Sequence, residues 1–239
     1  MTGVGHLSTV ELKLLLRRKI TAFSVVVVPI GLAALLLFGP TPSSRTEWAG
    51  QLSRDFLLLM MLSVYLVSLT VFTARRQSLV LKRLRTSGLS DAGVLAGVLG
   101  PVVVVGLVQT VAYLGFCLAI GAPAPTAPLL AVLGVVTGLA VATAAGVATA
   151  CLSRSVEATQ LTSTPMLLAT MAGLFLTASE SAAASTVGLS MPLAGSMDLL
   201  AMGWGGGFGN VPLDVGTALA WVAVSALVFR RFFRWEPRG

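Results

Sequence analysis

The sequence predicts an all-α integral membrane protein with six transmembrane helices and both termini in the cytoplasm. Three observations predict this class. Of the 239 residues, 56% are hydrophobic and only 10% are charged, whereas a soluble domain carries about 25% charged residues. Six apolar stretches are long enough to cross a bilayer, and the basic residues gather in the segments that would lie on one side of it. A soluble fold would expose too much apolar surface to water.

The six predicted spans follow from length. A bilayer core about 30 Å thick needs roughly 20 helical residues. The six stretches contain no Asp, Glu, Lys or Arg, and residues 1–239 are taken as one transmembrane domain. They are Ile20–Phe38, Phe56–Thr73, Gly93–Ile120, Pro128–Leu152, Leu161–Ser179 and Val215–Phe229.

The predicted orientation follows from the basic residues, which accumulate in cytoplasmic segments. Fourteen of the sixteen Lys and Arg residues lie in the N-terminal segment, the connection between the second and third spans, the connection between the fourth and fifth spans, and the C-terminal tail. Only Arg45 and Arg54 lie on the other side, together with acidic residues such as Asp198 and Asp214. Six spans with both termini inside account for this distribution.

The segment before the first span predicts an amphipathic helix at the cytoplasmic membrane surface. Ser8 and Glu11 have the spacing of a capping box, in which each side chain bonds the other's backbone NH. In a helix that continues to Lys19, an apolar stripe lies largely opposite the basic residues. The stripe is Leu12, Leu15 and Leu16, and the basic residues include Arg17 and Arg18. The alternative is a basic flank that only fixes the topology. The apolar run that follows is too long for a cleaved signal peptide.

The connection after the second span predicts a short cytoplasmic helix. At 100° per residue, Val80, Leu81 and Leu84 share one stripe, while Lys82 and Arg83 lie away from it. An apolar ridge of this kind can dock into a groove on a soluble partner. A loop whose basic residues only set the topology is the alternative.

The outer connection from Glu180 to Asp214 is too long for a simple turn. Its first part, Thr186–Met197, is mostly apolar, and a glycine-rich stretch follows at residues 202–210. No lysine follows the glycines, so this stretch is not a phosphate-binding loop. We expect the apolar part to be ordered against the helices, with a flexible turn anchored by Trp204 and Phe208 as the alternative.

Several classes of chemistry lack the residues they need. His6 is the only histidine, the cysteines follow no metal-ligand spacing, and none of the three lysines lies in a Walker A motif. The sequence therefore predicts no enzyme, no metal site, no cofactor in this chain and no nucleic-acid partner. No pair of carboxylates is predicted inside the membrane. Candidate residues for lining a transport path are the polar and Met side chains Gln109, Tyr113, Thr162, Met166 and Thr170. The alternative is that hydroxyls bond their own helix and Met packs against neighbours.

With these features in place, the chain resembles the permeases of ABC-2 type exporters, especially small bacterial drug or antibiotic exporters. In these permeases the cytoplasmic connection between the second and third spans has the pattern acid-x-x-x-G-T-L-K-R-L-R-x-(T/S)-P-L-S. The corresponding residues are Val80-Leu-Lys-Arg-Leu-Arg-Thr-Ser-Gly-Leu-Ser90. This chain has Gly88 in place of the family's proline, and Arg75, Arg76 or Gln77 in place of an acidic residue before the motif.

The resemblance implies a role for the chain and for its segments. The coupling helix to a separate ATPase would comprise Ser78, Leu79, Val80, Leu81, Lys82, Arg83, Leu84, Arg85 and Thr86. The outer connection would form a pair of short re-entrant helices. The implied partners are a second copy of the chain, two ABC ATPase subunits that bind ATP and Mg, membrane lipid and a lipophilic substrate. The implied function is export across the bacterial inner membrane. A non-transporting membrane protein, such as an immunity protein, or an ion-coupled carrier is the alternative.

Overall fold

The protein is described from a computed structural model, in which residues 19–78 and 90–233 are described. Within these ranges every regular element is a helix and no strand occurs. The predicted N-terminal interfacial helix and most of the predicted coupling helix lie outside the described residues, and Ser78 is the one residue of the coupling helix inside them.

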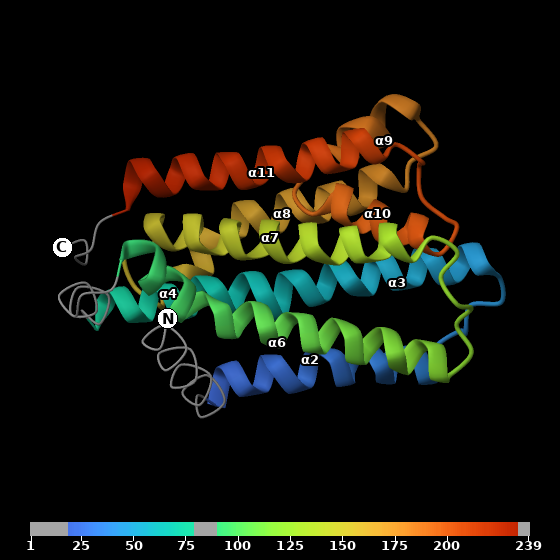
Figure 1. The fold of residues 1–239 in the computed structure, drawn as a ribbon, viewed down its shortest axis with the longest axis horizontal. Helices are drawn as coiled ribbons and strands as arrows, with labels where there is room; N and C mark the ends of the chain where they lie inside the picture. The colour runs from blue at the N-terminus through green and yellow to red at the C-terminus, as the bar shows by residue number, and fades with distance from the viewer. Residues whose placement is uncertain (1–18, 79–89, 234–239) are drawn as a thin grey trace.

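Six long helical stretches form an elongated bundle (Figure 1). The second stretch is a continuous run of two α-helices joined by a π-helical segment. The long elements are α2 (Lys19–Phe38), α3 (Arg45–Leu59) with η1 (Met60–Tyr65) and α4 (Leu66–Gln77), α6 (Asp91–Ala119), α7 (Pro128–Leu152), α8 (Thr159–Thr177) and α11 (Val211–Phe232). Two short helices, α9 (Ala182–Leu189) and α10 (Ala194–Gly203), lie between α8 and α11.

Among the described residues, four helices are both long and apolar enough to cross a membrane. They are Arg45–Gln77, Ala92–Ala119, Pro128–Leu152 and Val211–Phe232. A shorter apolar helix covers Val26–Phe38 within α2. Helix α8 has the length of a span but carries Thr and Ser side chains throughout its sequence. The predicted count of six crossings therefore remains a prediction for α2 and α8.

The second long helix begins eleven residues before the predicted start at Phe56. Ser44 caps it, because its side chain accepts a hydrogen bond from the Glu47 backbone NH, and Glu47 in turn accepts one from the NH of Ser43 at 2.8 Å. The polar residues that follow are satisfied within the helix, since Gln51 donates to Asp55 at 2.9 Å. The predicted start of this span at Phe56 was therefore too late, because local capping and side-chain bonds extend the helix through a polar sequence.

Helix α7 lies at the centre of the bundle, and its glycines allow close contact with its neighbours. A Cβ on Gly146 would lie 2.7 Å from the carbonyl oxygen of Tyr65, which ends the π-helical segment. A Cβ on Gly134 would lie 2.8 Å from the backbone of α10. The Tyr65 hydroxyl also donates to Thr149 on α7 at 3.2 Å. Close backbone approach of this kind holds helices together where lipid supplies no hydrophobic drive.

The outer connection is ordered, as expected. All ten residues of α10 are buried, and the helix packs against α3, α7 and α11. Residues 190–193 separate it from α9, and Leu193 among them adopts a left-handed backbone with φ 65°. The two short helices predicted by resemblance are thus present as α9 and α10.

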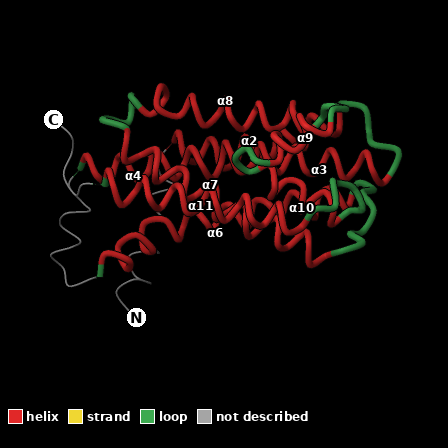
Figure 2. The backbone as a smooth tube through the Cα atoms, turned by 90° about the horizontal axis from the view of Figure 1, so that it is seen from above, coloured by secondary structure: helices red, strands yellow, loops and turns green. Residues whose placement is uncertain are grey.

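The connecting loops gather at the two ends of the bundle (Figure 2). Arg75 and Arg76 end α4, Arg154 follows α7, and Arg230 and Arg231 end α11, all at one end of the bundle. The end of α8 and the start of α11 lie at the other end. This arrangement places the described basic residues of the predicted cytoplasmic segments together.

Candidate functional site

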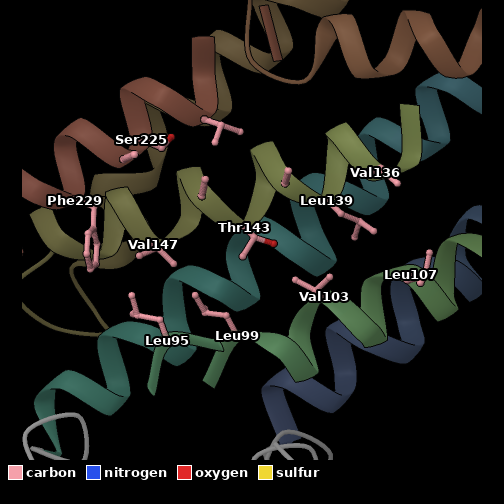
Figure 3. A pocket seen from close by; sticks show the side chains of 14 residues that line it. Leu95, Leu99, Val103, Leu107, Val136, Leu139, Thr143, Val147, Ser225 and Phe229 are labelled. Atoms are coloured by element: carbon pink, nitrogen blue, oxygen red, sulfur yellow. The ribbon is translucent and has the colours of Figure 1, made fainter. Parts of the chain in front are cut away.

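An apolar groove of about 610 Å³ lies between α6, α7 and α11 (Figure 3). Its fourteen lining residues come from α6, α7 and α11, and none of them is charged. They are Leu95, Leu99, Val103, Leu107, Val136, Leu139, Ala140, Thr143, Ala144, Val147, Val222, Ser225, Ala226 and Phe229. A volume of this size is in the range of small-molecule sites, about 300–1,000 Å³.

The groove exists because α6 and α11 both pack against α7 and diverge on either side of it (Figures 1 and 3). The floor is formed by α7, whose side chains Ala140 and Ala144 are too small to fill the space. Leucine and valine side chains of α6 form one wall, and Phe229 of α11 closes the end near the basic residues. The small alanine side chains on this face of α7 thus leave a groove between the larger side chains of α6 and α11.

Two hydroxyl groups are the polar side-chain groups of this groove. The Thr143 oxygen is buried, and no hydrogen-bond partner is found for it among the described residues. Most other Thr side chains of α7 and α8 bond the backbone of their own helix, for example Thr137 to Leu133 at 2.8 Å. Ser225 lies on α11 across the groove from Thr143 (Figure 3). The groove can therefore hold an apolar molecule and offer it one free hydroxyl.

The five predicted path residues do not come together in this groove. Gln109 is buried and donates to Ser63 in the π-helical segment at 3.5 Å, and Tyr113 donates to Asp55. These two therefore tie α6 to the Arg45–Gln77 run. Their role in a path stays a prediction.

The three predicted path residues on α8 also lie outside the lining of the groove. Thr162 pairs with the Ser153 hydroxyl at 2.5 Å and also bonds its own helix. Thr170 is fully buried and bonds the carbonyl of Met166, and Met166 packs against the hydrophobic core. The structure gives these side chains packing and helix-bonding contacts, which is the alternative that the sequence left open.

At the end where the basic residues gather, Arg76 is almost fully buried, at 1% exposure. Its guanidinium donates to the carbonyl of Ser153, the residue that ends α7. A cation at a helix C-terminus interacts favourably with the helix dipole. Two residues later, Ser78 ends α4 and donates to the Ala74 carbonyl at 2.9 Å. Arg76, two residues before the predicted coupling helix begins, thus ties the end of α4 to the end of α7.

Three carboxyl groups that the sequence places in connections between spans are buried in the bundle. Asp55 accepts hydrogen bonds from Gln51 and Tyr113. Asp198 on α10 and Asp214 in the first turn of α11 are 3% and 0% exposed. The sequence does not reveal that Asp198 and Asp214 are neighbours, because they are sixteen positions apart and lie on different helices. The capping pattern Ser44-x-x-Glu47 was a signal that α3 begins early and carries Asp55 inside.

A second, more polar cavity of about 440 Å³ lies between α3, α8, α10 and the glycine-rich loop. Arg54 and Asp198 line it, and Gly207 at φ 81° lets the loop pass close to Asp198. The backbone NH of Phe208 donates to both oxygens of Asp198, at 3.0 and 3.1 Å. Among the described residues, no group of three His, Cys, Asp or Glu side chains is placed to hold a metal ion.

Comparison with known proteins gives one match. A family model described as "ABC-2 family transporter protein" matches residues 12–232, which is nearly the whole chain. No curated protein and no solved structure matches the chain.

Proposed function

Because this chain belongs to the ABC-2 transporter family, we propose that it is the permease subunit of an ATP-driven exporter for a lipophilic or amphiphilic compound. The family match covers both ends of the helical bundle, from before α2 to the end of α11. Membership makes the chain a multi-pass membrane domain of an ABC transporter without a nucleotide-binding domain of its own. The substrate, the direction of transport and the energy source are the parts that we propose.

The uncharged groove between α6, α7 and α11 is the observation that carries the proposal on substrate. A charged molecule placed there would lose its hydration and gain no ionic partner, which is strongly unfavourable. An apolar or amphiphilic molecule would bury its surface against the leucine and valine walls at little cost. Several lining residues, including Leu107 and Val136, are also exposed on the bundle surface. A compound dissolved in the membrane could therefore reach the groove from the side.

The proposed energy source is a separate ABC ATPase that docks on the segment following α4. The apolar ridge of Val80, Leu81 and Leu84 would enter a groove of the ATPase, and the basic residues beside it would fix its register. Arg76 supports this arrangement, because it bonds the end of α7 only a few residues before the ridge. A movement of the ridge would reach α7, which forms the floor of the groove.

We further propose that two copies of the chain work together with two ATPase subunits in the bacterial inner membrane. A chain of 24.6 kDa encloses little space alone. In this proposal α2 and α8 complete six crossings, and α9 and α10 cap the outer end. The clustering of Arg75, Arg76, Arg154, Arg230 and Arg231 at one end of the bundle supports a cytoplasmic location for that end.

A groove-filling substitution tests this proposal. Ala144→Trp places a large side chain on the floor of the groove, whereas Val132→Trp places one at an exposed position of the same helix that does not line the groove. Vesicles containing the full complex would be assayed with a panel of neutral and cationic lipophilic dyes and antibiotics. We expect ATP-driven transport to be lost with Ala144→Trp and kept with Val132→Trp. Equal transport by both variants, each correctly inserted in the membrane, would show that the substrate does not pass through the groove.

An ion-coupled carrier is the second candidate, because three carboxyl groups are buried in the bundle. Intramembrane carboxyls are common in proton-driven transporters. The two candidates differ in their energy source. Transport that follows an imposed pH gradient without ATP would favour the carrier, and transport that stops when the ATPase partner carries an inactive Walker A lysine would favour the exporter.

A further inference from the structure

The carboxyl groups of Asp198 and Asp214 are neighbours, although one lies on the short helix α10 and the other in the first turn of α11. Their side chains are within hydrogen-bonding reach of each other. The backbones are also in close contact, since a Cβ on Gly195 would lie 2.6 Å from the Asp214 carbonyl oxygen. Gly195 precedes Asp198 by one helical turn, so this contact brings the two carboxyl groups to the same side of α10.

The two carboxyl groups differ in the donors available to them. Asp198 accepts the backbone NH of Phe208 on both oxygens. Asp214 is completely buried, and among the described residues no group donates a hydrogen bond to either of its oxygens. A buried carboxylate without any donor or cation is strongly unfavourable. The neighbouring group is itself an acid, so a proton shared between the two groups would form the missing hydrogen bond.

The elements packed around the pair bring little compensating charge. Helices α7, α8 and α9 contain no charged residue over their described lengths. From α3, Arg54 lines the same outer cavity as Asp198, but it is exposed and its guanidinium donates to Gln51 at 3.0 Å. Asp55 is engaged by Tyr113 and Gln51. No basic group therefore neutralises the pair among the residues that the structure describes around it.

We propose that Asp198 and Asp214 form a proton-binding site, in which one proton shared by the two carboxyl groups holds α10 against the start of α11. The bound proton makes one acid a donor and leaves the other an acceptor, which satisfies Asp214 and removes the repulsion between two like charges. Because α10 also packs against α7 and α3, the site fixes the cap over the outer end of the bundle. Loss of the proton would leave two buried negative charges in contact and would loosen the cap from α11.

The direction of the pH effect follows from the protons that each state binds. Burial raises the pKa of Asp198, although the bonds from Phe208 and Asp214 oppose this. An acid whose pKa is raised in the folded protein stabilises the fold at low pH, and this stabilisation is lost as the pH rises towards the folded-state pKa. We therefore expect the folded protein to lose stability as the pH rises from mildly acidic to mildly alkaline.

Infrared spectroscopy of the full chain in lipid tests the proposal directly, because a protonated carboxyl group absorbs separately from a carboxylate. We expect a protonated-carboxyl band at neutral pH in the wild type. The band should be absent in Asp214→Asn, whose amide can donate to Asp198 as the shared proton does. It should also be absent in Asp198→Asn, and it should persist in Asp55→Asn, since Asp55 already has two donors.

Thermal unfolding against pH is the second readout. We expect the midpoint of the wild type to fall with rising pH and the midpoint of Asp214→Asn to change much less. Glu180→Gln, an exposed acid in the same outer region, should keep the wild-type pH profile. A wild-type spectrum without a protonated-carboxyl band at neutral pH would overturn the proposal, as would a band that survives in both Asn variants. If neither Asn variant folds, the wild type is compared with Asp55→Asn. A protonated-carboxyl band and a pH-dependent midpoint in both proteins support the proposal, and loss of either in Asp55→Asn contradicts it.

Discussion

The guanidinium of Arg76 bonds the carbonyl of Ser153, and this pair joins the end of α4 to the end of α7. The Ser153 hydroxyl also pairs with Thr162 of α8. Three helices are therefore connected at one point, directly before the segment that is predicted to bind the ATPase. Since α7 contacts most of the other helices and forms the floor of the groove, this point is suited to pass movement from the coupling segment into the bundle.

The first prediction concerns Arg76. A hydrogen bond to a charged group contributes about 1.5–3 kcal/mol to stability, so Arg76→Met should lower the free energy of unfolding by about that amount. Arg154→Met removes an exposed charge next to Ser153, and its effect should stay within about 0.5 kcal/mol. Unfolding of the purified protein in detergent measures both. Equal effects of the two variants would show that loss of charge, and not loss of the Ser153 bond, is responsible.

The second prediction concerns the crossings of α8 and of the Arg45–Gln77 run. Single cysteines would be placed at the exposed positions Gln77, Thr46, Arg154 and Glu180, in a background in which the buried Cys117 and Cys151 are replaced by Ala. A membrane-impermeant thiol reagent should label Thr46→Cys and Glu180→Cys from outside, and it should reach Gln77→Cys and Arg154→Cys only after the membrane is opened. Labelling of Arg154→Cys and Glu180→Cys from the same side would show that α8 does not cross.

The third prediction concerns the free hydroxyl in the groove. Thr143→Val keeps the shape of the side chain and removes the oxygen. If a substrate bonds this oxygen, the loss of about 0.5–1.5 kcal/mol should raise KM roughly two- to tenfold without lowering kcat. Thr137→Val is the matched control on the same helix, since Thr137 bonds its own backbone and does not line the groove. A KM unchanged in Thr143→Val, for every transported compound of the panel, would contradict a substrate contact at this oxygen.

Much of the fold was predictable, because long apolar helices follow from composition and length. The predicted limits of the fourth span, Pro128–Leu152, are those of α7, since Pro128 stands in its first turn and the helix ends just before Ser153 and the charged Arg154. The early start of α3 was not predicted, because polar residues such as Arg54 and Asp55 weigh against a span when apolarity alone is counted. Their satisfaction by Gln51 and Tyr113 depends on three-dimensional contacts.

The candidate site was less predictable. Hydroxyl and Met residues were chosen as path residues by type, but in α7 and α8 such side chains mostly bond their own helix or pack in the core. The groove depends instead on small residues such as Ala140 and Ala144 beside large ones on α6 and α11. Which face of each helix meets which neighbour is set by packing, for example by Gly134 against α10, and a single sequence does not reveal that pairing.

The fourth prediction concerns the ridge of Val80, Leu81 and Leu84, which lies outside the described residues. Burying one Leu side chain contributes roughly 1.5–3 kcal/mol, so Leu81→Asp with Leu84→Asp should abolish co-purification of the ATPase. Lys82→Gln with Arg83→Gln should weaken it only slightly, because exposed ion pairs contribute about 0–1 kcal/mol. A loop that only sets topology predicts the reverse pattern. Pull-down from membranes, with insertion checked separately, measures the difference.

The most direct test of the central claim is ATP-driven transport by the complex in sealed vesicles. The full chain is purified with its associated ATPase, reconstituted, and supplied with ATP and Mg on the ATPase side together with a neutral lipophilic dye. The account predicts that the dye moves away from the ATPase side only with ATP, and that an inactive Walker A lysine in the partner stops it. Dye movement that is independent of ATP, or that continues when the partner carries the inactive Walker A lysine, would contradict the account.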